Sequence, residues 1–356
     1  MLSVCAGSVS WRARHRPWDP EKGMSQMKLA WAMSLFVLTA AFSMGSASAQ
    51  TLGVVGGSLH DEAQGVIDFA SVGWSEQLVE AGIVDIGVYE PDPTVRWEPR
   101  YDGYGYNWAR GGASAMSPTF RDLAPDDPRF KDLVPFSVQI EGLAQQIAAG
   151  EIDIAFIGIG GNDVTIWQLL GGSFSGPEFE AFSARLVDAI FAAVTAFQRA
   201  GDAAIVVATL PTAPDTPLAR ATANASINAA IRTRAAELGV AVLDLYGFVD
   251  DPRRITRREE VRVGPYRIPL TSVATASDLV APDSPDASGP CQLVSGLCST
   301  RQYNLNFLLH DDVHPTTAIN GLIANEFVST VRRAYHIWLR KLSDREILAA
   351  AGLSCH

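Results

Sequence analysis

The stretch Thr51–Asp61, TLGVVGGSLHD, decides the fold class of this chain. Its first part, Leu52–Val55, is apolar and is typical of a strand buried within a sheet. Gly56 and Gly57 then permit a tight turn and a close approach of the backbone, and Ser58 follows at once. Ser58 is therefore predicted at the carboxyl end of the first strand, where α/β sheets bind their ligands. Taken alone, the pattern is more typical of a turn followed by a serine that caps a helix.

Helices and strands alternate regularly after this first strand. The helices show one apolar face, and the strands are short apolar runs. The predicted order is helix Phe136–Ala149, strand Ile152–Ile157, helix Pro177–Ala200, strand Ala204–Leu210, helix Ala219–Leu238 and strand Val240–Leu245. An earlier helix that ends at Ala81 and a last helix from about Ala318 to Leu342 complete the pattern. The alternation predicts a parallel sheet that is covered by helices on both faces.

The first residues, 1–49, are predicted to be a signal or leader segment. Lys28 precedes the apolar run Leu29–Phe42, which is shorter than the roughly 20 residues of a membrane-spanning helix. Ala47-Ser48-Ala49 then matches an A-x-A cleavage site. We expect cleavage near Ala49–Gln50, a secreted or periplasmic protein, and no stable membrane span after cleavage. An uncleaved signal anchor is the alternative.

A single domain is predicted for residues 50–345, with an insertion at about 250–305 and a tail at 346–356. The insertion is marked by a charge run followed by Pro- and Ser-rich sequence that breaks the alternation. It contains Cys291 and Cys298, which in an exported protein are expected to form a local disulfide. Their spacing does not match a zinc knuckle. No disulfide partner is predicted for Cys355.

The composition argues against a nucleic-acid partner. The formal net charge is −11 over 356 residues, and the body of the chain has no basic stripe. Apolar residues make up 47% of the chain, which favours a folded core over disorder. We expect a monomer that acts on a small molecule or a polymer.

Several strand ends carry polar sequence suited to acyl transfer, and a parallel sheet would bring such loops to one edge. A serine hydroxyl becomes a nucleophile when a base lies within hydrogen-bond reach, and His314 is the natural base for Ser58. Asp311 lies three residues earlier and can hold the other ring nitrogen of His314. The N–H of Ser58, the N–H of Gly112 and the side-chain amide of Asn162 are candidate donors to the oxyanion.

The four blocks that carry these residues resemble, in the same order, the motifs of the SGNH (GDSL-type) hydrolases. They are GGSL at Gly56–Leu59, NWARGGAS at Asn107–Ser114, GGND at Gly160–Asp163 and DDVHPT at Asp311–Thr316. Further stretches are similar to a mostly secreted bacterial subgroup of undefined substrate. The resemblance implies a three-layer α/β/α sandwich whose central parallel sheet has about five strands. It also implies ester hydrolysis without a metal or other cofactor.

Gly57 departs from the family pattern, which has an acidic residue at this position. In the family that carboxylate helps to organise the nucleophile loop without belonging to the triad. A catalytically weak or inactive binding protein on the same fold is therefore one alternative. A metal-dependent phosphoesterase that uses His310 and His314 beside Asp311 and Asp312 is another. Pro315 and the lack of a third histidine in a supporting motif argue against the metal site.

The sequence is compatible with two substrate classes, acyl esters of lipids and acetyl esters of carbohydrates. Four aromatic residues of one loop are candidates for a groove that stacks on sugars, although they would serve equally to pack the loop down. They are Trp97, Tyr104, Tyr106 and Trp108. The absence of a long apolar lid favours short acyl chains. His60 is expected to be a solvated loop residue.

Overall fold

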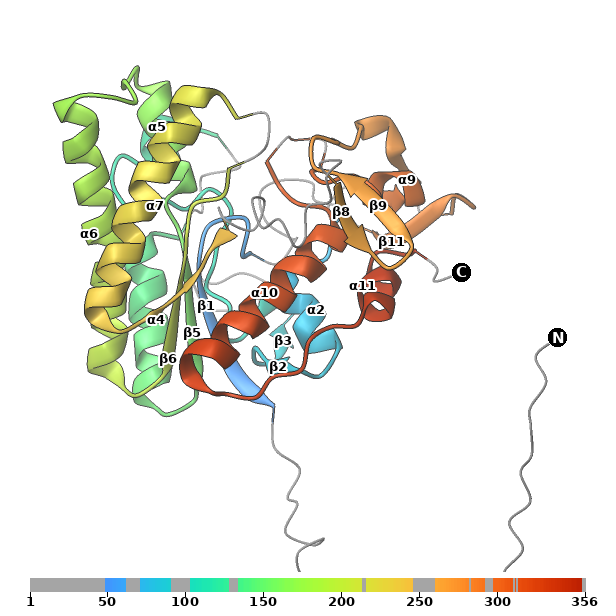
Figure 1. The fold of residues 1–356 in the computed structure, drawn as a ribbon, viewed down its shortest axis with the longest axis horizontal. Coiled ribbons are helices and arrows are strands. Elements are labelled where there is room, and N and C mark those ends of the chain that lie inside the picture. Colours follow the sequence, from blue (N-terminus) through green and yellow to red (C-terminus); the bar gives the residue numbers. More distant parts are fainter. Residues whose placement is uncertain are drawn as a thin grey trace, which may run out of the picture. The chain divides into compact units, whose positions relative to one another are not determined.

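Five parallel strands form the central sheet, in the spatial order β2-β1-β5-β6-β7 (Figure 1). Their bounds are β1 Gln50–Gly56, β2 Val84–Asp85, β5 Ile154–Gly158, β6 Ala204–Ala208 and β7 Ala241–Leu243. Gly56 pairs with Gly158 across β1 and β5, so the chain leaves both strands at the same level of the sheet. The loops that follow these two strands therefore start side by side.

The computed structural model describes residues 49–356 except for 62–70, 91–102, 128–133, 213–215, 246–259, 282, 292–296, 310, 312 and 354–356. The described residues belong to one unit, Ala49–His356. Apart from Ala49, the predicted leader lies outside them. Within the described part of the chain, no helix is long and apolar enough to cross a membrane.

Helices cover both faces of the sheet (Figure 1). One layer contains α4 Phe136–Ala148, α6 Pro177–Ala200 and α7 Leu218–Leu238, and the other contains α2 Trp74–Glu80 and α10 Thr317–Tyr335. Neighbouring residues of one strand point to opposite faces. Accordingly Val55 packs in the core on the α4 side, whereas Val54 packs in the core on the α10 side. The predicted three-layer α/β/α fold is confirmed.

The last long helix is shorter than predicted. α10 ends at Tyr335, because His336 adopts a left-handed backbone conformation with φ 57° and terminates the helix. The chain up to Leu342 is not helical. A separate helix, α11 Asp344–Ala350, then begins at a capping box formed by Ser343 and Glu346.

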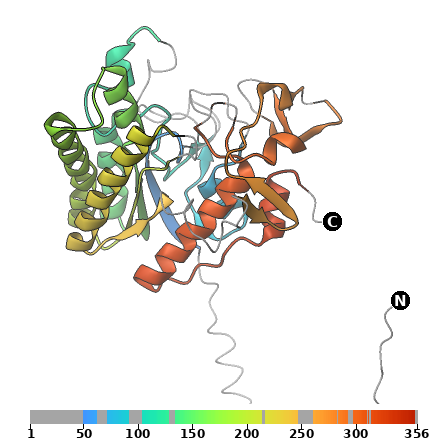
Figure 2. The same cartoon turned by 45° about the horizontal axis from the view of Figure 1, so that its top comes forward.

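Short elements fill the region of the predicted insertion and lie beside α11 (Figure 2). They are β8 Glu260–Val263, β9 Tyr266–Pro269, η1 Ala276–Asp278, β10 Leu279–Val280, β11 Ala287–Cys291, β12 Cys298–Thr300 and α9 Arg301–Asn304. Elsewhere the chain forms β3 Tyr89–Glu90, β4 Gly103–Tyr104, α3 Phe120–Leu123 and α5 Gly161–Leu169. Ile347 and Leu348 of α11 are fully buried in the same core as the β8–β9 hairpin. The segment predicted as a tail thus contributes to the core of the domain.

Candidate active site

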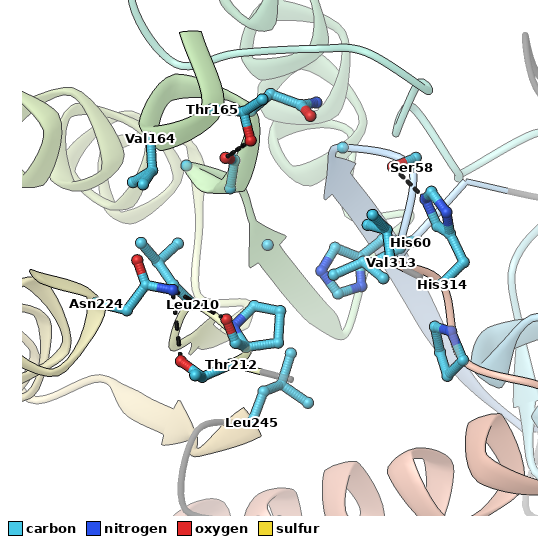
Figure 3. A pocket seen from close by; sticks show the side chains of 18 of the residues that line it. Ser58, His60, Val164, Thr165, Leu210, Thr212, Asn224, Leu245, Val313 and His314 are labelled. Atoms are coloured by element: carbon cyan, nitrogen blue, oxygen red, sulfur yellow. Dashed lines mark hydrogen bonds between the residues drawn. The ribbon is translucent and has the colours of Figure 1, made fainter. Parts of the chain in front are cut away.

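Ser58 and His314, from the two ends of the domain, meet at the cavity wall (Figure 3), and Asp311 contacts the other side of the His314 ring. Ser58 Oγ lies 2.7 Å from His314 Nε2, although the two residues are 256 positions apart in sequence. On the other side of the ring, His314 Nδ1 lies 2.5 Å from Asp311 Oδ2. Asp311 Oδ1 accepts the N–H groups of Val313 and His314, each at 3.0 Å, which fixes the carboxylate within its own loop. The structure therefore brings together all three residues that the sequence predicts as a Ser-His-Asp set.

The charge state of Asp311 suits a partner of the imidazole. Burial alone would raise the pKa of the Asp311 carboxyl, but the hydrogen bond and the charge attraction of His314 and the two backbone N–H groups lower this pKa below its ordinary value. The carboxylate is therefore ionised at neutral pH and accepts a hydrogen bond from the Nδ1–H group of His314. This leaves Nε2 as the acceptor for the Ser58 hydroxyl.

The backbone around Ser58 is held by close glycine contacts. The Gly57 N–H donates to Gly158 O at 3.0 Å, and the His60 N–H donates back to Gly57 O at 3.0 Å, so Ser58 lies within a closed turn. A Cβ on Gly56 would lie 2.2 Å from Gly158 O, and a Cβ on Gly158 would lie 2.1 Å from His60 Nε2. Only glycine fits at these two strand ends.

The candidate oxyanion donors belong to Ser58, Gly112 and Asn162, which line the same cavity. Gly112 has a positive φ of 79°, and Asn162 stands in the first turn of α5. The amide Nδ2 of Asn162 donates to Ala113 O at 2.7 Å, and its second N–H is not used by this bond. Within the described residues, the backbone N–H groups of Ser58 and Gly112 donate to no other group. All three residues line one cavity.

This cavity has a volume of about 540 Å³ and contains Ser58 and His314 in its wall. In Figure 3 these two residues lie opposite Leu210, Thr212 and Asn224. Much of the remaining surface is apolar, with Val164, Leu245, Phe307, Ile319 and Ile323 among the lining residues. The site therefore combines a polar reactive edge with a sizeable apolar interior.

The predicted aromatic groove does not form in the described part of the chain. Trp97 lies outside the described residues, and Tyr104, Tyr106 and Trp108 do not line the cavity. The segment around Asn107 pairs with β1, because Val54 N–H donates to Tyr106 O at 2.9 Å and Trp108 N–H donates to Val54 O at 2.8 Å. This pairing turns Trp108 into the core against α4, where it is 4% exposed and donates through Nε1 to Gln146.

His60 is buried rather than solvated. Its Nδ1 accepts the indole N–H of Trp74 at 3.1 Å, and its ring meets Phe156 edge to face with centroids 4.8 Å apart. Burial and the charge of His314 lower the pKa of His60 to about 3, so the ring is neutral at physiological pH. His60 thus forms part of the cavity wall near Ser58. Its sequence neighbours give no signal of this role, since the partner Trp74 belongs to α2.

The metal alternative finds no support among the described residues. They contain no group of three or more His, Cys, Asp or Glu side chains placed to hold a metal ion. His310 and Asp312, which the alternative invoked, lie outside the described residues.

Asp163 anchors the loop beyond the candidate oxyanion residues, a role that the sequence analysis missed. Its carboxylate accepts the N–H groups of Ala115 and Met116, each at 2.9 Å. Burial raises the pKa of Asp163 to about 6, although hydrogen bonds from three backbone N–H groups act in the opposite direction. The GGND block offers a partial signal, because an acid directly after the predicted donor Asn162 is part of the same motif.

Asp163 is expected to make the stability of the fold depend on pH. A raised pKa means that the folded state favours the protonated form, so this stabilisation is complete below about pH 4 and is lost as the pH rises through about 6. Relative to Asp163→Asn, the wild type should gain on the order of 3 kcal/mol in free energy of unfolding between pH 7 and pH 4. Urea titrations of both proteins across this range measure the difference. A difference that stays constant with pH would contradict the expectation.

Comparisons with known proteins show the family of this chain. The model of the GDSL-like lipase/acylhydrolase family matches residues 77–260, which is just over half of the chain. No curated protein matches the chain. Among solved structures, the chain is similar to TesA, with 15% identity and a TM-score of 0.37 over 80% of this chain and 99% of that one. It is also similar to Axe2, an acetylxylan esterase from Geobacillus stearothermophilus, with 14% identity and a TM-score of 0.39 over 83% and 98%.

Proposed function

The chain belongs to the GDSL-like lipase/acylhydrolase family and is a carboxylic ester hydrolase, and from this premise we propose that it is a secreted serine esterase that uses Ser58, His314 and Asp311. One observation carries the proposal. Ser58 Oγ lies 2.7 Å from one nitrogen of His314, and the other nitrogen lies 2.5 Å from an ionised carboxylate. A nucleophile, a base and an orienting acid at hydrogen-bond distance are the arrangement that acyl transfer requires.

The reaction begins with attack of Ser58 Oγ on the ester carbonyl carbon. His314 Nε2 takes the hydroxyl proton as the new C–O bond forms, and Asp311 stabilises the resulting imidazolium. The bond to the leaving alcohol then breaks, and His314 returns the proton to the alcohol oxygen. Water attacks the acyl-enzyme with His314 again as the base, which releases the carboxylic acid and restores Ser58.

The negative charge of the tetrahedral intermediate falls on the former carbonyl oxygen. We assign its stabilisation to the N–H of Ser58, the N–H of Gly112 and the Asn162 amide. These groups are positioned before the substrate binds, so little reorganisation is needed in the transition state. The Asn162 amide keeps its orientation through its bond to Ala113 O.

The cavity favours an apolar acyl or alcohol group over an acetyl group on a sugar. Its volume of about 540 Å³ far exceeds the space that an acetyl group fills, and residues such as Leu210, Phe307 and Ile319 would contact hydrocarbon. The described aromatic residues that would have stacked on sugars lie elsewhere. We therefore propose that lipid-type acyl esters are better substrates than carbohydrate acetates. We also propose a preference for longer acyl chains, in contrast to the short chains that the sequence favours.

A chain-length series tests the proposed function. With p-nitrophenyl esters from acetate to decanoate, kcat/KM should rise by about fourfold per methylene over the first members, because each buried methylene contributes about 0.8 kcal/mol. Acetylated xylan serves as the comparison substrate. Hydrolysis of every ester at one rate, or a preference for acetylated sugar, would contradict the assignment. The absence of any hydrolysis by folded protein would refute the esterase itself.

The proposal also includes export of the protein and a disulfide between Cys291 and Cys298. The leader sequence supports export. The register of β11 and β12 sets Cys291 opposite Cys298, which supports the expected bridge between them. Mass spectrometry of secreted protein, with and without reduction, would reveal both the mature start near Gln50 and the bridge.

A further inference from the structure

The loop that carries Gly112 is attached to the nucleophile loop by a carboxylate, that of Asp61. Asp61 Oδ2 accepts the N–H of Gly111 at 2.7 Å, and Gly111 directly precedes Gly112. Asp61 itself follows Ser58 by three residues and is buried. One short hydrogen bond therefore connects the loop that carries Ser58 with Gly111, the residue before the proposed oxyanion donor Gly112.

Other contacts show that this attachment belongs to a set that holds the turn at 110–113. The Ala113 N–H donates to Arg110 O at 3.1 Å and closes the turn, and Asn162 Nδ2 donates to Ala113 O at 2.7 Å. Below the turn, Asn107 Nδ2 donates to His60 O at 3.0 Å and joins the two loops a second time. Since Gly111 and Gly112 have no side chains, the direction of the Gly112 N–H depends on these bonds.

Gly57, a position at which the family carries an acid, lies beside the same turn. A Cβ on Gly57 would lie 3.5 Å from Asn162 Nδ2 and 3.6 Å from Ala113 O, in ordinary contact. A side chain at residue 57 would thus face the same turn that Asp61 holds through Gly111. We propose that Asp61 is a positioning residue that orients the turn at 110–113 and with it the Gly112 N–H. The inference rests on the proposed esterase function.

A purely structural role for Asp61 would be to neutralise Arg110, which is also buried. The distances favour the positioning role, because Asp61 Oδ1 lies 3.4 Å from Arg110 Nη1 whereas Oδ2 lies 2.7 Å from Gly111 N. Arg110 Nη1 also donates to Ala109 O at 2.7 Å. The carboxylate therefore makes its shortest described bond to the backbone of the turn, and a hydrogen bond to an ionised acceptor is a strong one.

Asp61→Ala tests the inference in the full mature chain. We expect kcat to fall by about 10–10² with little change in KM, because the misdirected donor acts in the transition state and not on the bound ester. The affinity for a trifluoromethyl ketone analogue, whose adduct carries the oxyanion, should fall by the same factor as kcat/KM. Asp153→Ala is the matched control, since Asp153 accepts the Thr51 N–H at 2.8 Å at the far end of β1.

A rescue experiment separates positioning from loss of the fold. Gly57→Asp introduced into Asp61→Ala should restore about tenfold in kcat, because the new carboxylate would face the same turn. Asp61→Asn, which keeps the shape, replaces Asp61→Ala if thermal unfolding shows that the latter does not fold. A fall in kcat with unchanged analogue affinity overturns the inference, and so does a double variant no more active than the single one. Wild-type protein without Ser58-dependent hydrolysis would instead refute the proposed function.

Discussion

Replacement of Ser58 by alanine should lower the turnover of a p-nitrophenyl ester by about 10⁴–10⁶, the largest effect expected for any single substitution in this chain. The substitution removes the hydroxyl oxygen that forms the acyl bond and that lies 2.7 Å from His314 Nε2. The remaining donors would still bind the carbonyl oxygen, so a small residual rate over water is expected.

The same variant identifies the nucleophile chemically. A fluorophosphonate probe should add one label to the wild type at Ser58 and none to Ser58→Ala, as measured by intact mass and peptide mapping. Ser183→Ala is a suitable control because Ser183 is a buried serine on α6 that does not line the cavity. Equal labelling of wild type and Ser58→Ala would remove Ser58 from the mechanism. A folded wild type that resists labelling would favour the alternative of an inactive binding protein.

Asp311→Asn is expected to reduce kcat by about 10²–10⁴. An asparagine at this position keeps the shape but cannot stabilise the imidazolium, and its amide can donate to Nδ1 and so favour the wrong tautomer. In the wild type the pKa of Asp311 is lowered, so the carboxylate stays ionised at pH values where an ordinary aspartate would already be protonated. Its contribution to stability is therefore present at neutral pH and is lost only as the pH falls through the lowered pKa.

Steady-state kinetics from pH 5 to pH 9 measure the expected loss in kcat of Asp311→Asn. The loss in kcat should persist at alkaline pH, where an unassisted imidazole is fully deprotonated, because the loss concerns the transition state. Asp153→Asn serves as a control carboxylate away from the cavity. Wild-type kcat in Asp311→Asn would show that another group orients His314.

Much of the fold could be predicted from local patterns. The strand Ile152–Ile157 and the helix Pro177–Ala200 were expected within one or two residues of β5 and α6, because an apolar run and a helical apolar face are properties of neighbouring residues. The end of the last helix could not be predicted in this way. No glycine or proline in the sequence marks the left-handed conformation of His336 that ends α10.

The motif blocks by themselves also identified the candidate site residues. These residues stand in sequence patterns that require their residue types, and they are Ser58, Gly112, Asn162, Asp311 and His314. Only the tertiary structure decided how their surroundings are built. The burial of His60 depends on Trp74, the removal of Trp108 from the groove depends on its pairing with β1, and the bond from Asp61 to Gly111 crosses 50 residues. Periodicity and turn chemistry act between neighbours in the chain, whereas these contacts exist only once the layers have packed.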